Sequence, residues 1–494
     1  MIEGVEITAS QGVIATGPAG AARIGARIFE LGGNAADATA AAALACTVLE
    51  PQAVDLGGYV FAAAVLDGSS DTVWSVDANA VAPSASREDM YQVLPMREGA
   101  PGINELEYGC SVEGDANVYG PLSVAVPGFV GGVGTLWQRW GSLQWDQIVA
   151  PARKLLEEGI GYGLVSSAAD FKRAVISRFP STEAILPAGA VGRWDRPDLL
   201  RTLGKLAEAG WRDFYDGEIG HCIADFVAEQ GGILTREDMA SFDTRTTEPY
   251  TGQYRNARLF TAIPPNGGYS VLDAMHDLEN RDLALESDPR YWMEIADVLK
   301  RMWSHRLCGK PCSTASPHGT IHIAAADRAG NLVSATISQG GLFGSCLAVP
   351  GTGIILAHGM CRFDPRPGLA NSPGPKKRPL NNVCPMIIRM PGRDLAIGAR
   401  GGRRIVSVAV QLVDRVVRQG ATVRDAATRP RLHTITGDPI EISADFESHV
   451  RDSLTHAGLR LTVPNEVAGA VHGAEILSTG EILRGSGNTW AVGV

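Results

Sequence analysis

The segment from Thr320 to Ser338 predicts a β-hairpin with one polar face, and this feature most constrains how the chain folds. Apolar and polar side chains alternate in TIHIAAAD and again in LVSATIS, and the residues at 328–330 between them are typical of a turn. A turn centred on residue 329 predicts three facing pairs: Thr320 with Ser338, His322 with Thr336, and Ala324 with Ser334. One face therefore carries hydroxyl groups and an imidazole, which fits either ordinary cross-strand pairing or a catalytic site.

A glycine directly before Thr320 favours the catalytic interpretation. A residue without Cβ permits the close approach that is needed when the Thr320 hydroxyl attacks the carbonyl of Gly319. The resulting acyl shift and hydrolysis would cut the chain between these two residues. The new N-terminal amine would then lie beside its own hydroxyl and could act as its general base.

The N-terminal region predicts helices that pack on strands. Residues 21–31 and 34–49 have apolar side chains at helical spacing, and Asn34 can cap the second helix. This second helix is so rich in alanine that it must pack closely against something flat, such as a sheet. Residues 59–67 and 71–77 predict strands. Further along the chain we expect a loop over roughly 95–120, helices over 130–159 and 199–239, and a strand near 253.

The composition excludes several classes of partner. The chain has 494 residues, 45% of them hydrophobic, and a net charge of -10, which suits a soluble globular protein with a large core. An acidic surface has no electrostatic attraction for nucleic acid or an anionic membrane, so we expect a small-molecule ligand. The N-terminus lacks the pattern of a secretory signal, and no run of about 18 apolar residues occurs, which predicts a cytoplasmic protein.

The eight cysteines do not follow the spacing of a metal site. Only Cys308 and Cys312 lie close together, and neither a second pair nor a histidine cluster follows them. Buried reduced thiols are therefore favoured over zinc, and we expect neither a metal nor an organic cofactor.

The chain resembles the gamma-glutamyltransferase family of N-terminal-nucleophile hydrolases over nearly its whole length. The resemblance lies in an ordered set of motifs that includes FELGGNAADATAAAA, VLEPQAVDLGG, PGTGIIL, KKRPLNN and GARGGRRI. It implies an α+β fold, the four-layer αββα sandwich. It also implies a precursor that is cut into a large subunit, residues 1–319, and a small subunit, residues 320–494, which together form one domain. The active form would be a heterodimer of these two fragments, and whether such heterodimers pair is left open.

The same resemblance implies roles for several residues. Thr320 matches the threonine that cuts the precursor and then forms the acyl-enzyme, and Ser338 matches the position whose hydroxyl steadies it. Gly401 and Gly402 match the pair whose backbone N–H groups form the oxyanion hole. His322 lies near the nucleophile, where we expect it to support the site and not to act in catalysis.

The expected acyl pocket departs from the family pattern. Asn381 and Asn382 stand where relatives have two serines that line the pocket. Asn79 stands where an arginine would hold the carboxylate of a glutamyl substrate, and Arg362 replaces the aspartate that would receive its ammonium group. A further expected asparagine is Gly340. Because both anchors of a glutamyl group are lost, gamma-glutamyl transfer is not favoured.

New positive charges indicate a different substrate. Arg400 and Arg403 flank the glycine pair, and an arginine holds a carboxylate bidentately. Together with Arg362 they predict an amidohydrolase for a small amide that bears a carboxylate, similar to family members that hydrolyse oxamate. Arg403 could instead point outward, and Arg362 could instead be a surface or ion-paired residue. Arg404 corresponds to a structural arginine of the family.

Two alternatives remain. The first keeps the acyl-enzyme but makes the protein an acylase, or a gamma-glutamyl or other acyl transferase. The second is an unprocessed, non-catalytic protein that binds an anion, because Ile321 and Gly340 alter the surroundings of the processing site. The basic run at 376–378 lies among prolines and glycines and predicts a solvated loop.

Overall fold

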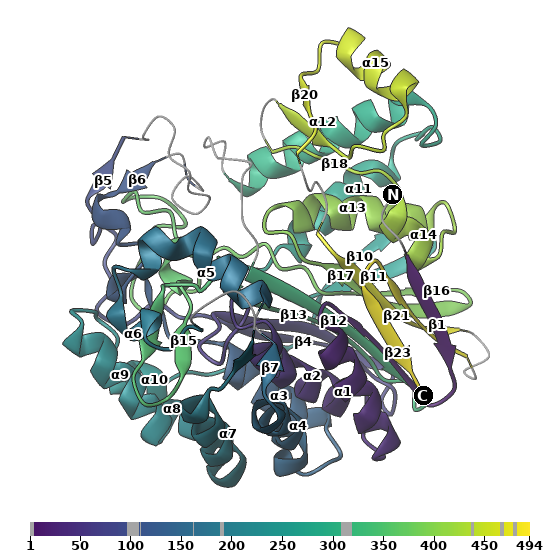
Figure 1. The fold of residues 1–494 in the computed structure, drawn as a ribbon. Helices are drawn as coiled ribbons and strands as arrows, with labels where there is room; N and C mark the ends of the chain where they lie inside the picture. Colours follow the sequence, from purple (N-terminus) through teal and green to yellow (C-terminus); the bar gives the residue numbers. More distant parts are fainter. Residues whose placement is uncertain are drawn as a thin grey trace.

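Two seven-stranded antiparallel sheets are stacked face to face, and helices cover both outer faces (Figure 1). The computed structural model describes residues 4–95, 108, 110–161, 163–187, 192–307, 319–435, 439–464, 469–477 and 482–494. This arrangement is the expected four-layer αββα sandwich of an α+β protein.

Each sheet combines strands from before and from after the predicted cleavage site. The first sheet has the order β23 (Trp490–Gly493), β2 (Gly12–Thr16), β12 (Gly319–Asp327), β13 (Leu332–Gly340), β3 (Val60–Asp67), β4 (Thr72–Asn79) and β9 (Arg245–Thr247). The second has the order β1 (Val5–Ala9), β22 (Leu483–Gly487), β21 (Val471–Leu477), β17 (Arg393–Ala399), β16 (Met386–Met390), β11 (Ala257–Thr261) and β10 (Tyr250–Tyr254). The two parts of the chain therefore build one domain.

The helices on the first sheet confirm the predictions for the N-terminal region. The helices on this side are α1 (Ala19–Glu30), α2 (Ala35–Leu49), α3 (Phe129–Trp140), α4 (Trp145–Glu158) and α7 (Pro197–Ala209). Asn34 and Asp37 form a capping box at the start of α2, since each side chain accepts from the backbone N–H of the other residue. All but the last residue of α2 are buried, and its alanines let it pack closely on β12 and β13.

The helices on the second sheet lie in the upper part of Figure 1. They are α11 (Gly268–Glu279), α12 (Pro289–Arg306), α13 (Arg404–Val417), α14 (Val423–Thr428) and α15 (Ser448–His456). The remaining α-helices, on the left of Figure 1, are α5 (Gly163–Ile176), α6 (Pro180–Glu183), α8 (Asp213–Asp216), α9 (Glu218–Glu229) and α10 (Arg236–Ala240). Minor strands form the pairs β5 (Val93–Leu94) with β6 (Ser111–Val112), β7 (Ile160–Gly161) with β8 (Arg193–Trp194) and β14 (Leu347–Val349) with β15 (Ile354–Leu356). A three-stranded unit contains β18 (Leu432–His433), β19 (Ile440–Ile442) and β20 (Leu461–Thr462).

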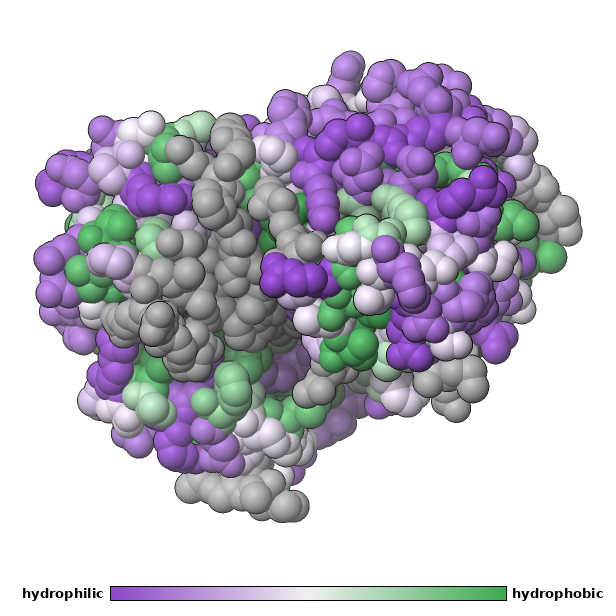
Figure 2. All heavy atoms as spheres, turned by 90° about the horizontal axis from the view of Figure 1, so that it is seen from above, coloured by the Kyte–Doolittle hydropathy of each residue, from purple (hydrophilic) through white to green (hydrophobic). Residues whose placement is uncertain are grey.

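The surface seen in Figure 2 is a mosaic in which hydrophobic side chains occur in groups among hydrophilic ones. Large apolar residues such as Leu164 and Phe171 of α5 are exposed. Within the described ranges, no helix combines the length and the apolar character needed to span a bilayer.

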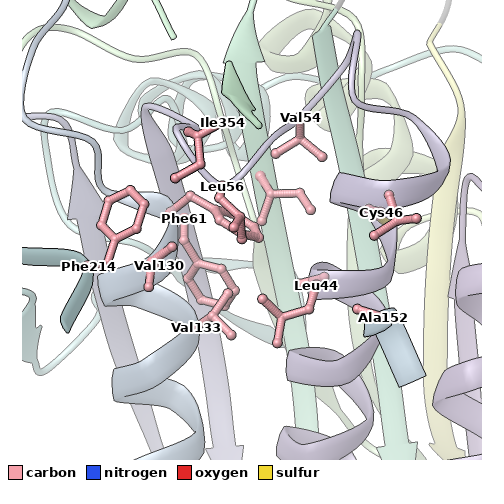
Figure 3. Close-up of a cluster of buried hydrophobic side chains, with 14 of the residues drawn as sticks. Leu44, Cys46, Val54, Leu56, Phe61, Val130, Val133, Ala152, Phe214 and Ile354 are labelled. Carbon is pink, nitrogen blue, oxygen red and sulfur yellow. The ribbon is translucent and has the colours of Figure 1, made fainter. Parts of the chain in front are cut away.

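Separate cores lie on the two sides of the first sheet. Between this sheet and its helices, Leu44, Phe61, Val130 and Val133 converge with other large side chains (Figure 3). Between the two sheets the core contains many small residues, among them Ala64, Ala324, Ala326, Ala396 and Ala474. Small side chains let the two sheets approach closely. The polar residues of the hairpin share a face with Ala324 and therefore also lie between the sheets.

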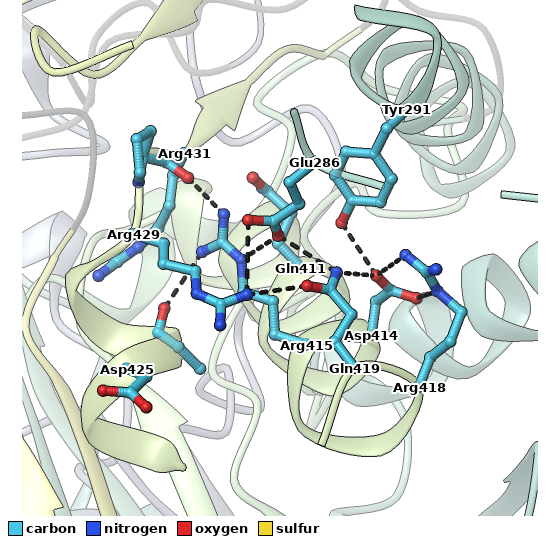
Figure 4. A network of polar contacts seen from close by, with 12 residues as sticks. Glu286, Tyr291, Gln411, Asp414, Arg415, Arg418, Gln419, Asp425, Arg429 and Arg431 are labelled. Atoms are coloured by element: carbon cyan, nitrogen blue, oxygen red, sulfur yellow. Dashed lines mark hydrogen bonds and ion pairs between the residues drawn. The ribbon is translucent and has the colours of Figure 1, made fainter. Parts of the chain in front are cut away.

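A buried polar network fastens the outer helices of the second sheet (Figure 4). Asp414 of α13 accepts hydrogen bonds from the hydroxyls of Tyr254 and Tyr291 and from the guanidinium of Arg418. The neighbouring Arg415 donates to Glu286 and to the backbone oxygen of Ala426 in α14. This network fixes α13, whose first turn follows directly on the predicted oxyanion glycines.

Candidate active site

The hairpin has the predicted register. Residues 320, 322 and 324 of β12 face Ser338, Thr336 and Ser334 of β13, and a bulge at Gly319 and Thr320 brings Gly319 opposite Gly340. Ile321, Ile323 and Ala325 point to the helix side and join its core, whereas Ala324 and Ala326 point between the sheets. Thr320 and His322 therefore lie on the inner face of the sandwich.

A chain of hydroxyl contacts surrounds the Gly319–Thr320 peptide bond. The Thr320 Oγ1 and Ser338 Oγ atoms lie 2.9 Å apart, and the Ser338 hydroxyl donates to the carbonyl oxygen of Gly319 at 2.5 Å. The Gly340 N–H donates to Ser338 Oγ at 3.0 Å. Because the only proton of the Ser338 hydroxyl is directed at Gly319, Thr320 must donate its own hydroxyl proton to Ser338.

Gly319 lies where no side chain fits. A Cβ atom at this position would come within 2.8 Å of the Gly341 carbonyl oxygen and 3.1 Å of the Ala53 carbonyl oxygen. Backbone packing on two sides therefore requires a glycine at this position.

His322 lies on β12, two residues after the nucleophile and on the same face, and its ring is held neutral. Its Nδ1 atom lies 2.9 Å from Thr336 Oγ1, and its ring lies against Gly398, where a Cβ atom would come within 2.3 Å of the ring. Complete burial lowers the pKa of His322 to about 3. Its ring is also 6.3 Å from that of the buried His472. A histidine so desolvated cannot accept a proton at neutral pH, which agrees with a supporting role.

Gly401 and Gly402 form the turn between β17 and α13. Their φ angles are +143° and +59°, which a side chain would disfavour. Within the described part of the chain, no hydrogen bond uses the N–H of either glycine, so both can donate to a ligand. Arg404 is the first residue of α13. Its side chain forms a buried bidentate ion pair with Glu441, which fixes the start of this helix. Arg404 therefore has the structural role that was expected.

Arg400 reaches the region of the nucleophile. It is two residues beyond Gly398, which contacts His322, and its Nη1 atom lies 3.9 Å from the carboxylate of Glu50. The turn that begins at Glu50 contains Ala53, whose carbonyl oxygen packs against Gly319. About a third of the Arg400 side chain is exposed, so its guanidinium is accessible to a small anion.

Asn79 and Asn381 are brought together in a buried network. The hydroxyl of Tyr59 donates to Asn381 Oδ1 at 2.9 Å, and Asn381 Nδ2 donates to Asn79 Oδ1 at 2.8 Å. Asn79 Nδ2 in turn donates to Asn266. The backbone N–H of Tyr59 donates to the carbonyl oxygen of Ser338 at 3.0 Å. Tyr59 therefore connects the pair of asparagines to the hydroxyl chain.

Asn382 and Arg362 lie at the edges of this network. Arg306 of α12 donates to the Asn381 carbonyl oxygen at 2.6 Å and approaches Asn382 Oδ1 at 3.4 Å. The Arg362 side chain is buried and its guanidinium carbon lies 5.8 Å from the centre of the Tyr59 ring. The alternative of a surface position for Arg362 is therefore wrong.

Two further expectations from the sequence are wrong. Arg403 does not point outward: it is 3% exposed, and its guanidinium lies over the rings of Tyr108 and Trp303. The basic run at 376–378 is not simply a solvated loop, because Lys377 is half-buried and Arg378 donates to the backbone oxygen of Asn79. In both cases residues distant in sequence supply the packing.

Several site residues have no signal in the sequence that would assign them. Tyr59, Arg306 and His358 connect segments more than 70 residues apart. The positions of Tyr59 after a double glycine and of His358 within PGTGIILAHGMCRF are compatible with many roles.

Among the described residues, no group of three or more histidine, cysteine or acidic residues could hold a metal. Cys308 and Cys312, for which reduced thiols were favoured over a zinc site, lie outside the described residues.

The family assignment comes from comparisons with known proteins. The family model described as gamma-glutamyltranspeptidase matches residues 21–310 and 309–494. The acylase ACY 1 proenzyme of Pseudomonas sp. strain V22 is 28% identical over 94% of this chain and 90% of its own. The glutathione hydrolase proenzyme of Escherichia coli strain K12 is 25% identical over 97% of this chain and 90% of its own.

A solved structure has the same fold. The cephalosporin acylase of Bacillus halodurans superposes with a TM-score of 0.84 over 99% of this chain and 97% of that chain, at 23% identity. The relatives named above are amide-cleaving enzymes made as proenzymes, and the family match extends over almost the whole chain. The protein is therefore an amide-cleaving member of the gamma-glutamyltranspeptidase family of N-terminal-nucleophile hydrolases.

Proposed function

We propose that the protein cuts itself between Gly319 and Thr320 and then uses Thr320 as an N-terminal nucleophile to hydrolyse a small amide that bears a carboxylate. The observation that carries this proposal is the chain of contacts from Thr320 Oγ1 through Ser338 Oγ to the Gly319 carbonyl oxygen. The proposed fragments are residues 1–319 and 320–494, and they interleave in both sheets, so they would stay together after cleavage.

The contacts supply both proton movements of self-cleavage. Thr320 Oγ1 forms a bond to the Gly319 carbonyl carbon while its proton passes to Ser338 Oγ, and the Ser338 proton passes to the Gly319 oxygen. Collapse of this adduct breaks the C–N bond, and the Thr320 nitrogen takes the proton that the collapsing hydroxyl gives up. Water then hydrolyses the ester and leaves Thr320 with a free amine. No titratable side chain is needed, which suits a site where His322 is held neutral.

The same groups serve the turnover of substrate. The free amine of Thr320 accepts the hydroxyl proton as Oγ1 attacks the substrate amide, and the Gly401 and Gly402 N–H groups stabilise the oxyanion. Ser338 fixes the nucleophile. The amine or ammonia leaves with the proton, and water releases the acid from the acyl-enzyme.

The arginines support an anionic acyl group. Arg400 lies close to the glycine turn, and Arg362 lies over the ring of Tyr59. In oxamate the carboxylate is bonded directly to the scissile carbonyl carbon, so we expect it to lie near these two guanidinium groups. Arginine remains charged when it is partly buried. Asn381 and Asn382 then supply amide groups at the pocket wall, and Asn79 holds Asn381 in place.

Intact mass under denaturing conditions tests the proposal. The wild-type protein is expected to give two fragments, the smaller one beginning with Thr-Ile-His, and to release ammonia from oxamate. Thr320→Ala is expected to give one full-length chain without activity. A wild-type chain that remains intact after long incubation would refute self-cleavage and favour a non-catalytic anion-binding protein.

An acylase or acyl transferase is the second candidate, because the acylase ACY 1 proenzyme is among the relatives that cover most of the chain. It keeps the acyl-enzyme but requires a longer acyl group or an amine acceptor. Product analysis with and without an added amine separates the two: an amide product formed only with the amine indicates transfer, and free acid in both cases indicates hydrolysis.

A further inference from the structure

A cavity of about 410 Å³ lies beside the buried asparagine network. Its wall includes Tyr108 and Tyr269 and several leucines, and three cationic residues face it: Arg306, Lys377 and Arg378. Its size and its largely apolar wall with few polar groups are those of a site for an organic molecule.

Among the described residues, no carboxylate forms a hydrogen bond or close ion pair with these three cations; Glu88 acts on Lys377, and Asp77 and Asp243 act on Arg378, only through longer-range electrostatic attraction. Arg306 donates to the Asn381 carbonyl oxygen and to the Ser270 hydroxyl, and Lys377 donates to the Ser372 carbonyl oxygen at 2.7 Å. Arg378 donates to the carbonyl oxygens of two further residues, Asn79 and Asp243. Every one of these acceptors is an uncharged oxygen.

Asp364 is the one carboxylate among the described lining residues, and it does not balance the three cations. Asp364 is buried and forms a bidentate ion pair with Arg366, at 2.6 and 2.8 Å. Burial lowers the pKa of Lys377 and of Arg378, and the attraction of Glu88 for Lys377 and of Asp77 and Asp243 for Arg378 does not fully offset it. The cavity therefore has an excess of positive charge, and Arg306 in it is only 5% exposed.

Hydrogen-bonded residues link the wall of the cavity to the candidate active site. Arg306 contacts the backbone of Asn381, whose side chain bonds to Tyr59, and Tyr59 bonds to Ser338. Pro265, which lines the cavity, accepts the backbone N–H of Asn381. The cavity therefore borders Asn381, a residue of the proposed acyl pocket.

We propose that this cavity binds a carboxylate attached to a flat apolar body, and that it holds the part of the substrate remote from the scissile amide. The cations neutralise the carboxylate, and the tyrosine rings pack on the apolar body. The second half of this proposal rests on the amidohydrolase function. It extends the substrate class from oxamate itself to amides with a second carboxylate on an aromatic or apolar arm.

Binding of 3-phenylpropanoate, measured by isothermal titration calorimetry, tests the site. The probe is expected to bind both the wild-type protein and Thr320→Ala, because the cavity exists in the uncut chain, and the uncharged 3-phenylpropan-1-ol is expected not to bind measurably. Lys377→Gln is expected to weaken binding roughly tenfold, the usual effect of losing one charged hydrogen bond, and Lys377→Arg to restore it. Lys154→Gln, at an exposed lysine of α4, is the matched control and is expected to bind as the wild type does.

Two results would overturn the proposal in separable ways. Equal affinity for the acid and the alcohol, or equal affinity in Lys377→Gln and Lys154→Gln, would show that the cations do not form an anion site. Competitive inhibition of ammonia release by the probe supports the substrate assignment, whereas binding without competitive inhibition would refute it and leave the anion site standing. Thr320→Ala is expected to bind the probe but to release no ammonia from oxamate. Probe binding therefore tests the anion site even if the amidohydrolase proposal fails.

Discussion

The imidazole ring of His358 occupies the space in which a side chain at Gly340 would lie. A Cβ atom on Gly340 would come within 2.3 Å of His358 Nε2, and the φ angle of Gly340 is +92°. His358 Nε2 accepts the backbone N–H of Gly341 at 2.7 Å, and its Nδ1 donates to the carbonyl oxygen of Val118. The ring thereby fixes the end of β13, where Gly340 donates to Ser338.

Gly340→Ala is expected to destabilise the protein more than an alanine in an open turn does. Gly420→Ala is the matched control, because Gly420 also has a positive φ but nothing lies within 4 Å of its added Cβ atom. Backbone strain alone costs about 1 kcal/mol, and overpacking against His358 should raise the cost at Gly340 to about 3 kcal/mol. Thermal unfolding of both variants in the Thr320→Ala background measures the difference. Equal melting temperatures would contradict the packing argument.

Ser338→Ala is expected to slow self-cleavage roughly 100-fold, as removal of a single oxyanion donor does in other acyl transfers. The hydroxyl is lost both as the acceptor for Thr320 and as the donor to the Gly319 oxygen. Appearance of the two fragments, followed by mass over time, gives the rate. Ser338→Thr keeps the hydroxyl and should restore processing.

Ser334→Ala is the control for this experiment. Ser334 lies on the same face of β13, but it contacts Ile397 and Met386 and not Thr320. Processing of Ser334→Ala at the wild-type rate, together with slow processing of Ser338→Ala, is the expected pattern. Rapid processing of Ser338→Ala would exclude the proposed proton path.

Arg362→Gln is expected to discriminate between charged and uncharged amides. If Arg362 binds the carboxylate, kcat/KM for oxamate should fall at least tenfold while that for the uncharged oxamide changes little. Arg193→Gln removes an exposed arginine of β8 and serves as the control. An unchanged ratio of the two kcat/KM values in Arg362→Gln would remove Arg362 from the substrate site.

Alternation and turn chemistry made the hairpin register predictable, because a strand has a period of two and a slip of one residue would move Thr320 to the helix side. The cap at Asn34 is equally local. The position of Arg403 was not predictable in this way. Its burial depends on Tyr108 and Trp303, which come from other segments of the chain.

The candidate site also contains both kinds of contact, those between residues of one local pattern and those between distant segments. Thr320 and Ser338 are paired by one hairpin, so their contact follows from the local pattern. Tyr59 and Asn381 are 322 positions apart, and only the stacking of two sheets and the course of the long connection after β15 bring them together. A residue pattern contains no record of such a contact, and for the same reason the basic run at 376–378 predicts a solvated loop although Lys377 and Arg378 line the cavity beside Asn381.

The buried histidines should make the protein less stable in mild acid. The pKa of His322 is about 3 in the folded protein, against about 6.5 in an unfolded chain, so between these values the unfolded chain binds more protons. His322 therefore lowers the stability as the pH falls below about 6.5, by up to about 1.4 kcal/mol per pH unit. Burial also lowers the pKa of His358 and of His472, which act in the same direction.

His322→Asn is expected to reduce the loss of melting temperature between pH 7.5 and pH 5.0, because one proton-linked group is removed. His305→Asn, at an exposed histidine of α12, should leave the loss as it is in the wild type. The Thr320→Ala background keeps the chain in one piece for both measurements. A loss in His322→Asn as large as in the wild type would show that His322 is not the desolvated group that its surroundings indicate.

Asp414→Asn should be among the most destabilising single changes in the outer helices. The Asp414 carboxylate is fully buried and accepts bonds from Tyr254, Tyr291 and Arg418. Burial alone would raise the pKa of Asp414, but the bonds from Arg418 and Tyr254 outweigh it and hold the pKa below its usual value. The charged form therefore stabilises the fold above the usual pKa of an aspartate, and this contribution is lost as the pH falls through the lowered pKa.

Removal of this charge leaves Arg418 partly buried without its partner, at a cost of about 3 kcal/mol or more. Asp195→Asn is the control, because its ion pair with Arg193 is exposed and should contribute less than about 1 kcal/mol. Urea unfolding of both variants at pH 7.5, in the Thr320→Ala background, gives the comparison. Since α13 begins directly after the Gly401 and Gly402 turn, Asp414→Asn in the otherwise wild-type protein should also lower kcat on oxamate. Equal unfolding midpoints for the two variants would mean that the network in Figure 4 does not hold α13 in place.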